Sequence, residues 1–418
     1  MGADGAGSYS VSRFRQVVPG LIGAVLLLGA IALMAFVFGR GGGGGFSPPA
    51  DDAIAALIEV EQVRSSPKLD VVSGLQRPGD ERHPEPLVEL ADIRSGGPPP
   101  DGIPPIDRPF FERANDVEWL APAEAVVVLE RGGETRAYPV QVLTWHEIVN
   151  DTVAGEPVTV SYCPLCNSAV AYERTLADGT VLDFGTSGSL YNSSLVMYDR
   201  QTETLWTHFD GLAVVGHLTG AQLNLIPMTT VAWEDFVSEY PDALVLSRTT
   251  GYSRDYGANP YPGYDDPDED PFLFDGRVDD RLRPKDRVAV ARLGDDSVTV
   301  EWDEITAARV HVTTVNGVRI AFVHAPGAVS ALEGHNVRGG RDVGAVAVYE
   351  LGEAGEGMRA TNEAGLFESS DGTRWNIFGE AVSGPAAGER LMPVEHLDTF
   401  WFAIAAFDPD TRLESPPS

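Results

Sequence analysis

The chain has 418 residues, of which 43% are hydrophobic, and it carries 62 acidic residues against 30 basic ones, for a net charge of −32. A surface of this charge repels nucleic acid and anionic lipid headgroups, so the composition excludes nucleic-acid binding as a main function. The length is sufficient for a membrane anchor and two modest domains.

An apolar run near the N-terminus covers residues 17–38, which is 22 residues. Because about 20 apolar residues span a bilayer, we expect a transmembrane helix here; the alternative, a cleaved signal peptide, usually has a shorter apolar core. Arg13 and Arg15 precede the run, and positive residues stay on the cytoplasmic side. The sequence therefore predicts a cytoplasmic segment at 1–16, a single-pass anchor in the cell membrane, and an extracytoplasmic remainder.

Glycine and proline dominate the segment that follows. Five consecutive glycines at 41–45 precede a series of prolines that ends in the pairs and triplets around residues 98–105. Such a composition is typical of extended, flexible chain, so we expect a tether over residues 39–100. From residue 124 onward, short β-like runs separated by glycine turns alternate with a few short helices, which indicates a mainly β fold of the β-rich α+β class.

Two parts of the sequence resemble each other. The stretch from Asp199 to Trp206 is followed by glycines at spacings that recur after the stretch from Asp371 to Trp375. The strand-like run that begins at Val158 has a counterpart at Val318, at a similar distance along the chain. Similar separations of this kind indicate internal duplication. We predict two related β-rich halves at 101–255 and 285–418, joined by an acidic, solvated linker at 256–284.

Both cysteines of the chain lie in a Cys-Pro-Leu-Cys sequence, at Cys163 and Cys166, between two predicted strands. Two thiolates at a tight turn can supply half of a four-coordinate metal site. His146 lies a short way upstream, and a carboxylate such as Glu147 or Asp199 could complete the set. The leading interpretation is a metal-binding or metal-handling protein that uses copper or zinc, because thiolates and imidazole are the ligands these metals prefer.

Two other interpretations of the cysteine pair stay open. In the first, the pair is a reversible dithiol in a thiol–disulfide oxidoreductase. In the second, it is a disulfide that staples a hairpin in a structural or adhesion module. Zinc peptidase and serine hydrolase motifs are absent, because HEIVND lacks a second histidine and Gly185–Gly188 does not have the spacing of a nucleophile elbow.

Several long motifs then identify a family. The strings YPVQVLTWHEIVND, VSYCPLCNSAVAYER, FGTSGSLYNSSLVMYDRQTETLW and DYGANPYPGY resemble the bacterial and archaeal family known as domain of unknown function 3179, from about Asp101 to the C-terminus. The resemblance implies no particular reaction. His208 departs from the pattern of the family, in which glutamine often follows the tryptophan step, and we therefore expect His208 to be a poor candidate for an essential ligand.

Overall fold

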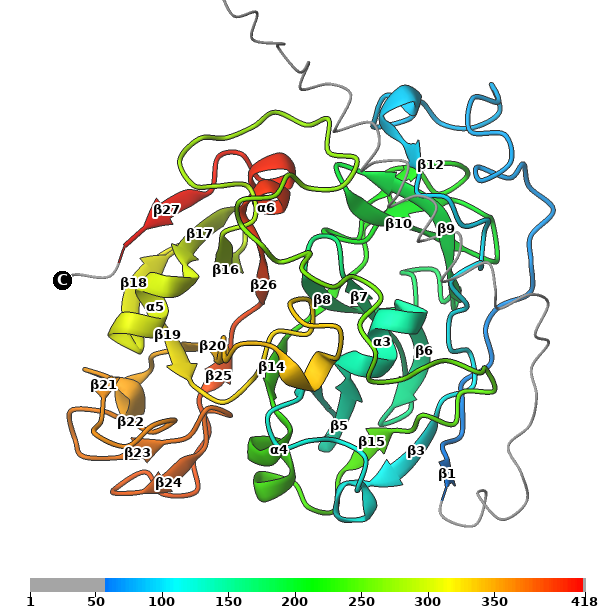
Figure 1. Cartoon of the computed structure of the whole chain (residues 1–418). Coiled ribbons are helices and arrows are strands. Elements are labelled where there is room, and N and C mark those ends of the chain that lie inside the picture. Colours follow the sequence, from blue (N-terminus) through cyan, green and yellow to red (C-terminus); the bar gives the residue numbers. More distant parts are fainter. Residues whose placement is uncertain (1–56, 416–418) are drawn as a thin grey trace, which may run out of the picture.

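The computed structural model describes residues 57–415 (Figure 1). The fold is β-rich, with several sheets and a few short helices, as the sequence predicts. Among the helices of residues 57–415, none is long and apolar enough to cross a membrane. The predicted cytoplasmic segment at 1–16 and the predicted anchor at 17–38 lie outside the described residues.

The first half, residues 101–255, contributes to three sheets. The first sheet has the order β1 (Ile58–Glu59), β3 (Phe110–Arg113), β15 (Leu244–Leu246), β5 (Glu134–Pro139), β4 (Ala125–Arg131) and β14 (Met228–Ala232). The second has the order β12 (Ala213–Val215), β11 (Leu205–Thr207), β10 (Ser194–Asp199), β9 (Phe184–Tyr191) and β2 (Arg94–Ser95). The third has the order β13 (Leu225–Ile226), β8 (Ser168–Glu173), β7 (Glu156–Cys163) and β6 (Ile148–Val153), and the helices are α3 (Val140–His146), α4 (Trp233–Glu239), η1 (Leu90–Asp92) and η2 (Ala114–Asp116).

The second half, described over residues 285–415, also contains three sheets. One has the order β26 (His396–Phe400), β16 (Arg287–Leu293), β17 (Asp296–Glu301) and β27 (Arg412–Glu414). Another has the order β18 (Val310–Val315), β19 (Val318–Ala325), β20 (Ala345–Glu350) and β25 (Met392–Pro393). The last has the order β21 (Arg359–Ala360), β22 (Phe367–Glu368), β23 (Arg374–Trp375) and β24 (Ala381–Ser383), and the helices are α5 (Trp302–Ala308), α6 (Trp401–Phe407), η3 (Val337–Gly339) and η4 (Glu353–Gly355).

The two halves present the same order of elements with the same spacing. The elements β4, β5, α3, β6 and β7 match β16, β17, α5, β18 and β19, and the start of each element is displaced by a constant amount from the start of its counterpart. The pairing registers agree as well. Ala125, the first residue of β4, pairs with Ala232, the last of β14, and Arg287, the first residue of β16, pairs with Phe400, the last of β26. In both halves the last strand then joins the sheet in parallel, β15 beside β5 and β27 beside β17.

The tryptophans that suggested the repeat occupy matching strands. Trp206 lies in β11 opposite Ala213, immediately after a bulge, and Trp375 lies in β23 opposite Ala381, again immediately after a bulge. Both indole rings are fully buried. In both halves, the strand that carries the tryptophan therefore pairs with the next strand along the chain and has a bulge just before the tryptophan.

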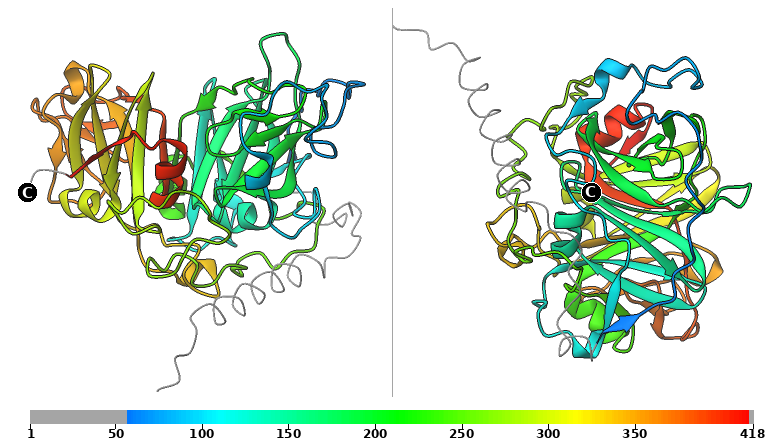
Figure 2. Two further views of the ribbon diagram at one scale, coloured as in Figure 1. Left: turned by 90° about the horizontal axis from the view of Figure 1, so that it is seen from above. Right: turned by 90° about the vertical axis from the view of Figure 1, so that its right-hand side faces the viewer.

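The two halves lie side by side and pack through their sheets (Figure 2). At the junction β14 of the first half contacts β20 of the second, and β26 of the second contacts β8 of the first. The backbone N–H of Phe400 and the hydroxyl of Thr399 both donate to the carbonyl oxygen of Cys166, at 3.1 and 2.9 Å. The turn that carries the cysteines is therefore held by a strand of the other half.

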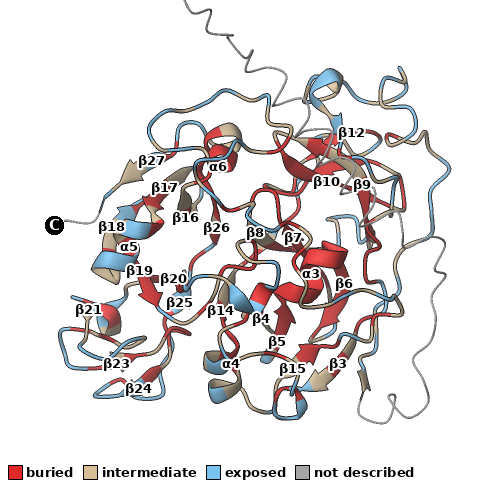
Figure 3. Ribbon diagram, in the orientation of Figure 1, coloured by how far each residue is buried: buried red, intermediate tan, exposed pale blue. Residues whose placement is uncertain are grey.

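Helix α3 lies in the interior, and all of its residues are buried (Figure 3). It begins after Pro139, whose fixed φ and missing N–H suit the boundary of a helix. The helix ends at Glu147, which has a φ of 59°. It lies between β5 and β6 in the chain, with His146 as its last residue and Glu147 directly after it.

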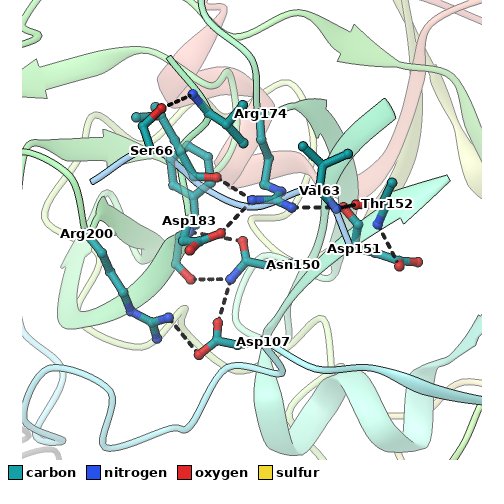
Figure 4. Close-up of polar contacts among 12 residues, drawn as sticks. Val63, Ser66, Asp107, Asn150, Asp151, Thr152, Arg174, Asp183 and Arg200 are labelled. Atoms are coloured by element: carbon teal, nitrogen blue, oxygen red, sulfur yellow. Dashed lines mark hydrogen bonds and ion pairs between the residues drawn. The ribbon is translucent and has the colours of Figure 1, made fainter. Parts of the chain in front are cut away.

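Part of the predicted tether is ordered against the first half. The sequence predicts a flexible segment over 39–100, but residues 57–100, here called the docked segment, run along the sheets of the first half. The backbone N–H of Val63 donates to Thr152 Oγ1 at 2.9 Å, and that of Ser66 donates to the carbonyl of Val181 at 2.9 Å (Figure 4). Beneath this segment the buried guanidinium of Arg174 pairs with Asp183 at 2.6 Å. Backbone hydrogen bonds to distant strands hold the docked segment, and composition alone does not reveal such bonds.

The acidic linker at 256–284 also differs from the expectation. The sequence predicts a solvated connection, whereas Tyr261, Asp265 and Phe272 are buried. The carboxylate of Asp265 accepts a hydrogen bond from Ser330 and pairs with Arg287 at 3.2 Å. Parts of this linker are therefore packed into the fold, although most of its residues are exposed or half-buried.

Candidate functional site

The Cys-Pro-Leu-Cys sequence forms the turn of a hairpin, as the sequence predicts. Strand β7 ends at Cys163 and β8 begins at Ser168, and these two residues pair across the ladder. Asn167 closes the turn with a φ of 50°, a conformation that asparagine tolerates better than most residues. Cys163 and Cys166 are 1% and 0% exposed, and both are free thiols.

Hydrogen bonds converge on the sulfur of Cys166. Its Sγ lies 3.1 Å from Ser168 Oγ and 3.5 Å from Ser194 Oγ, and the thiol of Cys163 is a further partner. Burial by itself would raise the pKa of Cys166, but these hydrogen bonds stabilise the thiolate more, so the pKa lies below its ordinary value. Cys166 is therefore the more acidic member of the pair.

The pKa of Cys163 is shifted in the opposite direction. Burial, followed by the neighbouring sulfur of Cys166, holds the pKa of Cys163 well above its ordinary value, although backbone hydrogen bonds from Cys166 and Leu195 reach its sulfur. Two interacting thiols lose their protons in separate steps. Cys166 therefore loses its proton before Cys163 does.

Glu147 is the predicted ligand that lies near the cysteines. Burial raises the pKa of its carboxyl well above the ordinary value, and the sulfur of Cys163 raises it further. The residue follows the last turn of α3, and its side chain is buried. Burial therefore favours the protonated form of this carboxyl.

His208, which the sequence predicts to be a poor candidate for an essential ligand, is the histidine that joins the thiol cluster. Its Nε2 lies 3.1 Å from Ser168 Oγ, which in turn contacts Cys166, and its Nδ1 lies 3.0 Å from Ser161 Oγ. Ser161 donates to the carbonyl of Glu147 at 2.8 Å. Burial lowers the pKa of His208 to about 3, so the imidazole is neutral. A chain of buried hydrogen bonds thus runs from Cys166 through His208 to the backbone of Glu147.

His146 takes part in a different set of contacts. Its Nδ1 lies 2.6 Å from the carbonyl oxygen of Pro104 and its Nε2 lies 2.6 Å from the hydroxyl of Tyr256, which in turn contacts Thr250 at 2.6 Å. Burial lowers the pKa of His146 to about 4. Both ring nitrogens therefore have protein partners other than the sulfurs.

The carboxylate of Asp199 makes hydrogen bonds to the residues that directly follow it in the chain. Its carboxylate accepts hydrogen bonds from the backbone and hydroxyl of Thr202, from the backbone of Thr204 and from the indole of Trp206 at 2.9 Å. Within residues 57–415, no group of three or more His, Cys, Asp or Glu side chains is placed to hold a metal ion. The structure therefore does not gather the five predicted ligands Cys163, Cys166, His146, Glu147 and Asp199 into one group.

The second half provides a comparison for the thiol cluster. Cys163 pairs with Ser168 in the first half, and at the same register Ala325 pairs with Ala345 in the second. Tyr172 donates to the carbonyl of His208, whereas Tyr349, at the same place in β20, donates to the carbonyl of Ile377. Ser161 in β7 corresponds likewise to Val323 in β19, since each stands at the same place in its strand. The buried polar cluster of the first half is thus apolar in the second, whose core contains Val323, Ala325, Ala345 and Ile377.

Comparisons with known proteins give one match. The sequence profile of the family described as "Protein of unknown function (DUF3179)" matches residues 100–411, which confirms the predicted resemblance. No curated protein and no solved structure matches the chain. The description of the family names no reaction, so the function must be argued from the site.

Proposed function

We propose that this chain, which belongs to the DUF3179 family, is a thiol–disulfide oxidoreductase that acts through Cys163 and Cys166. The observation that carries the proposal is the buried polar cluster around Cys166, at positions where the second half has apolar residues on the same strands. Burying polar groups costs stability unless they are fully hydrogen-bonded, and the second half indicates that the fold forms without them. The cluster is therefore retained for chemistry that needs a stabilised thiolate.

The two cysteines have different roles in this proposal. The Cys166 thiolate attacks one sulfur of a substrate disulfide, which forms a mixed disulfide and releases the other substrate sulfur as a thiolate. The released substrate thiolate then accepts the proton of the Cys163 thiol. The resulting Cys163 thiolate attacks the Cys166 sulfur, which closes the internal disulfide and releases the second substrate thiolate. The substrate gains two electrons and the cysteine pair loses two.

Burial of the sulfurs has a kinetic consequence. Because Cys163 and Cys166 are 1% and 0% exposed, a substrate reaches Cys166 only after the turn at 164–167 opens locally. The rate of exchange should therefore rise with the concentration of oxidant and then level off at the rate of opening. His208 and the serines around it are positioning residues, because they touch the sulfur of Cys166 or one another rather than the substrate.

Glutathione disulfide is a suitable probe for the test. The full chain is equilibrated in glutathione redox buffers, and its thiols are counted by mass spectrometry after alkylation. We expect one internal disulfide in the wild type, a mixed disulfide trapped on Cys166 in Cys163→Ser, and little adduct in Cys166→Ser. Adducts that form mainly on Cys163 would contradict the assigned roles. An internal disulfide that resists reduction in every buffer would instead support a structural staple.

Binding of a soft metal ion is the second candidate function, because backbone N–H groups also donate hydrogen bonds to the sulfurs. Backbone hydrogen bonds reach Cys163 from Cys166 and Leu195, and another reaches Cys166 from Ser168. Such bonds favour thiolates, and two thiolates suit Cu(I), which accepts soft ligands. This proposal rests on the two sulfurs alone. A titration with Cu(I) should give one bound ion in the reduced wild type and none in a Cys163→Ser, Cys166→Ser double variant, and equal binding by both proteins would eliminate it.

We also propose that the chain is anchored by residues 17–38 and that its described part lies outside the cytoplasm. The support is the length of the apolar run and the arginines that precede it. Reporter fusions after Gly45 and after Ser418 should both report an external location, and a cytoplasmic signal from either fusion would refute the topology.

Finally, we propose that the two halves arose by internal duplication. The constant displacement between five matched elements and the matching registers of β4–β14 and β16–β26 support this origin. Superposition of one half on the other should match them strand by strand, with both tryptophans coincident. Tryptophans on non-equivalent strands would refute the duplication.

A further inference from the structure

A small cavity lies between the two halves, on the face of β7 and β8 opposite the sulfurs. Its volume is about 50 Å³, and its lining includes Tyr162, Asn167, Arg287, Ser330 and Asp398. Tyr162 pairs with Ala169 across the hairpin, whereas Cys163 pairs with Ser168, so the cavity and the sulfurs are on opposite faces of the sheet. The cavity is therefore separate from the thiol cluster.

The two halves contribute different residues to this cavity. Ala125 and Thr230 line it from β4 and β14, and Arg287 and Asp398 line it from β16 and β26. Arg287 matches Ala125 as the first residue of its strand, and Asp398 matches Thr230 because each precedes the end of its strand by the same interval. One half thus supplies small neutral side chains, and the other supplies a guanidinium and a carboxyl at the matching positions.

Arg287 and Asp398 are neighbours that do not pair with each other. Arg287 pairs with Phe400 and Asp398 with Ala289 on the same ladder, which makes Arg287 and Asp398 diagonal neighbours on one face. Arg287 instead contacts Asp265 at 3.2 Å and Ser330 at 2.8 Å. Its Nε and the Oδ1 of Asp398 are buried and have no hydrogen-bond partner. Buried polar groups of this kind normally have a partner, so a ligand between them would complete the site.

The protonation of the carboxyl determines which ligand fits. Burial raises the pKa of Asp398 to about 8, and the nearby Arg287 limits this rise. The carboxyl is therefore protonated at neutral pH and can donate, as does the Nε–H of Arg287. Two unpaired donors that line one cavity, one of them on a cation, match the two oxygens of a planar anion.

We propose that this cavity binds a small planar oxyanion, a carboxylate or carbonate of three or four non-hydrogen atoms, held between Arg287 Nε and the Asp398 carboxyl. A buried water needs roughly 10–15 Å³, so a cavity of about 50 Å³ admits a ligand of this size but excludes larger acids. A wider cleft of about 380 Å³ adjoins this cavity, since Arg287, Trp302 and Val343 line both spaces. Lys285, whose ammonium group donates to Tyr264 at 2.8 Å, also lines this cleft.

Thermal unfolding of the full chain with sodium formate, acetate or bicarbonate tests the proposal. Sodium chloride at equal ionic strength is the reference. We expect each oxyanion to raise the midpoint of the wild type, and isothermal titration to give saturable binding. The variants Arg287→Ala and Asp398→Thr introduce the residues found at the matching positions of the first half, and each should weaken binding at least tenfold.

Arg319→Gln is the control, because Arg319 is about half exposed and lies on β19 away from the cavity lining. It should bind as the wild type does. Stabilisation by the oxyanions no greater than by chloride would show that the cavity holds only water and would overturn the proposal. Undiminished binding in both cavity variants would overturn it as well. Neither outcome bears on the thiol chemistry, which the glutathione experiment measures separately.

Discussion

Acid should destabilise the protein through His208 by a predictable amount. The folded state holds this imidazole neutral because burial lowers its pKa from 6.5 to about 3. The folded pKa is depressed, so the unfolded chain binds more protons between pH 6.5 and 3, and stability is lost as the pH falls through that window. At pH 5 the protonated form of the imidazole in the unfolded chain outnumbers the neutral form by about 30 to 1. This lowers the free energy of unfolding by about 2 kcal/mol.

The substitution His208→Gln isolates this contribution. Glutamine keeps a polar side chain for the two serines but cannot titrate. Urea unfolding of the full chain, followed by tryptophan fluorescence at pH 7.5 and pH 5, should show that the wild type loses about 2 kcal/mol more than the variant. His146, whose pKa is lowered to about 4, is present in both proteins, and its contribution cancels.

The control for this experiment is His217→Gln, at an exposed histidine of the same half. This variant should lose as much free energy of unfolding between pH 7.5 and pH 5 as the wild type does. Equal losses in the wild type and in His208→Gln would refute the reasoning, because they would mean that the cluster tolerates a charged imidazole when folded.

Two further substitutions test the scaffold. Asp151→Asn alters a buried carboxylate that accepts hydrogen bonds of 2.7 Å from Arg136, Tyr138 and the backbone of Thr152, and it should cost about 3 kcal/mol in urea unfolding. Glu156→Gln at an exposed ion pair should cost less than about 1 kcal/mol. Gly188→Ala should release the docked segment, since an added Cβ would lie 2.0 Å from the carbonyl oxygen of Pro98, and limited proteolysis should then cut that segment faster. Gly179→Ala, with a similar positive φ but no atom within 4 Å, should leave the cleavage rate unchanged.

Local pattern was sufficient to predict the β-rich class and the hairpin of the cysteines. The strand-like residues on both sides of Cys163 and Cys166 and the proline between them determine that turn. The docked segment could not be predicted in the same way. Its contacts, such as that of Ser66 with Val181, join distant parts of the chain through the backbone, and no side-chain pattern reports them.

The candidate site was predicted in part for the same reason. His146 was chosen because it is close in sequence, but α3 directs its ring toward Pro104 and Tyr256. His208 joins the cluster because Tyr172 holds its backbone beside β8, which is a contact between separate strands. The signal that could have found it is the repeat itself, since a histidine stands where the other half has Ile377.

A second half that lacks cysteines would ordinarily be expected to be dispensable for thiol chemistry. Here it cannot be discarded freely, because Phe400 and Thr399 hold the carbonyl of Cys166. These two hydrogen bonds can differ in strength between the dithiol and disulfide forms of the pair. In the proposed exchange, that difference changes the reduction potential of the pair directly. Under the proposed function, the reduction potential of the cysteines therefore depends on both halves of the chain.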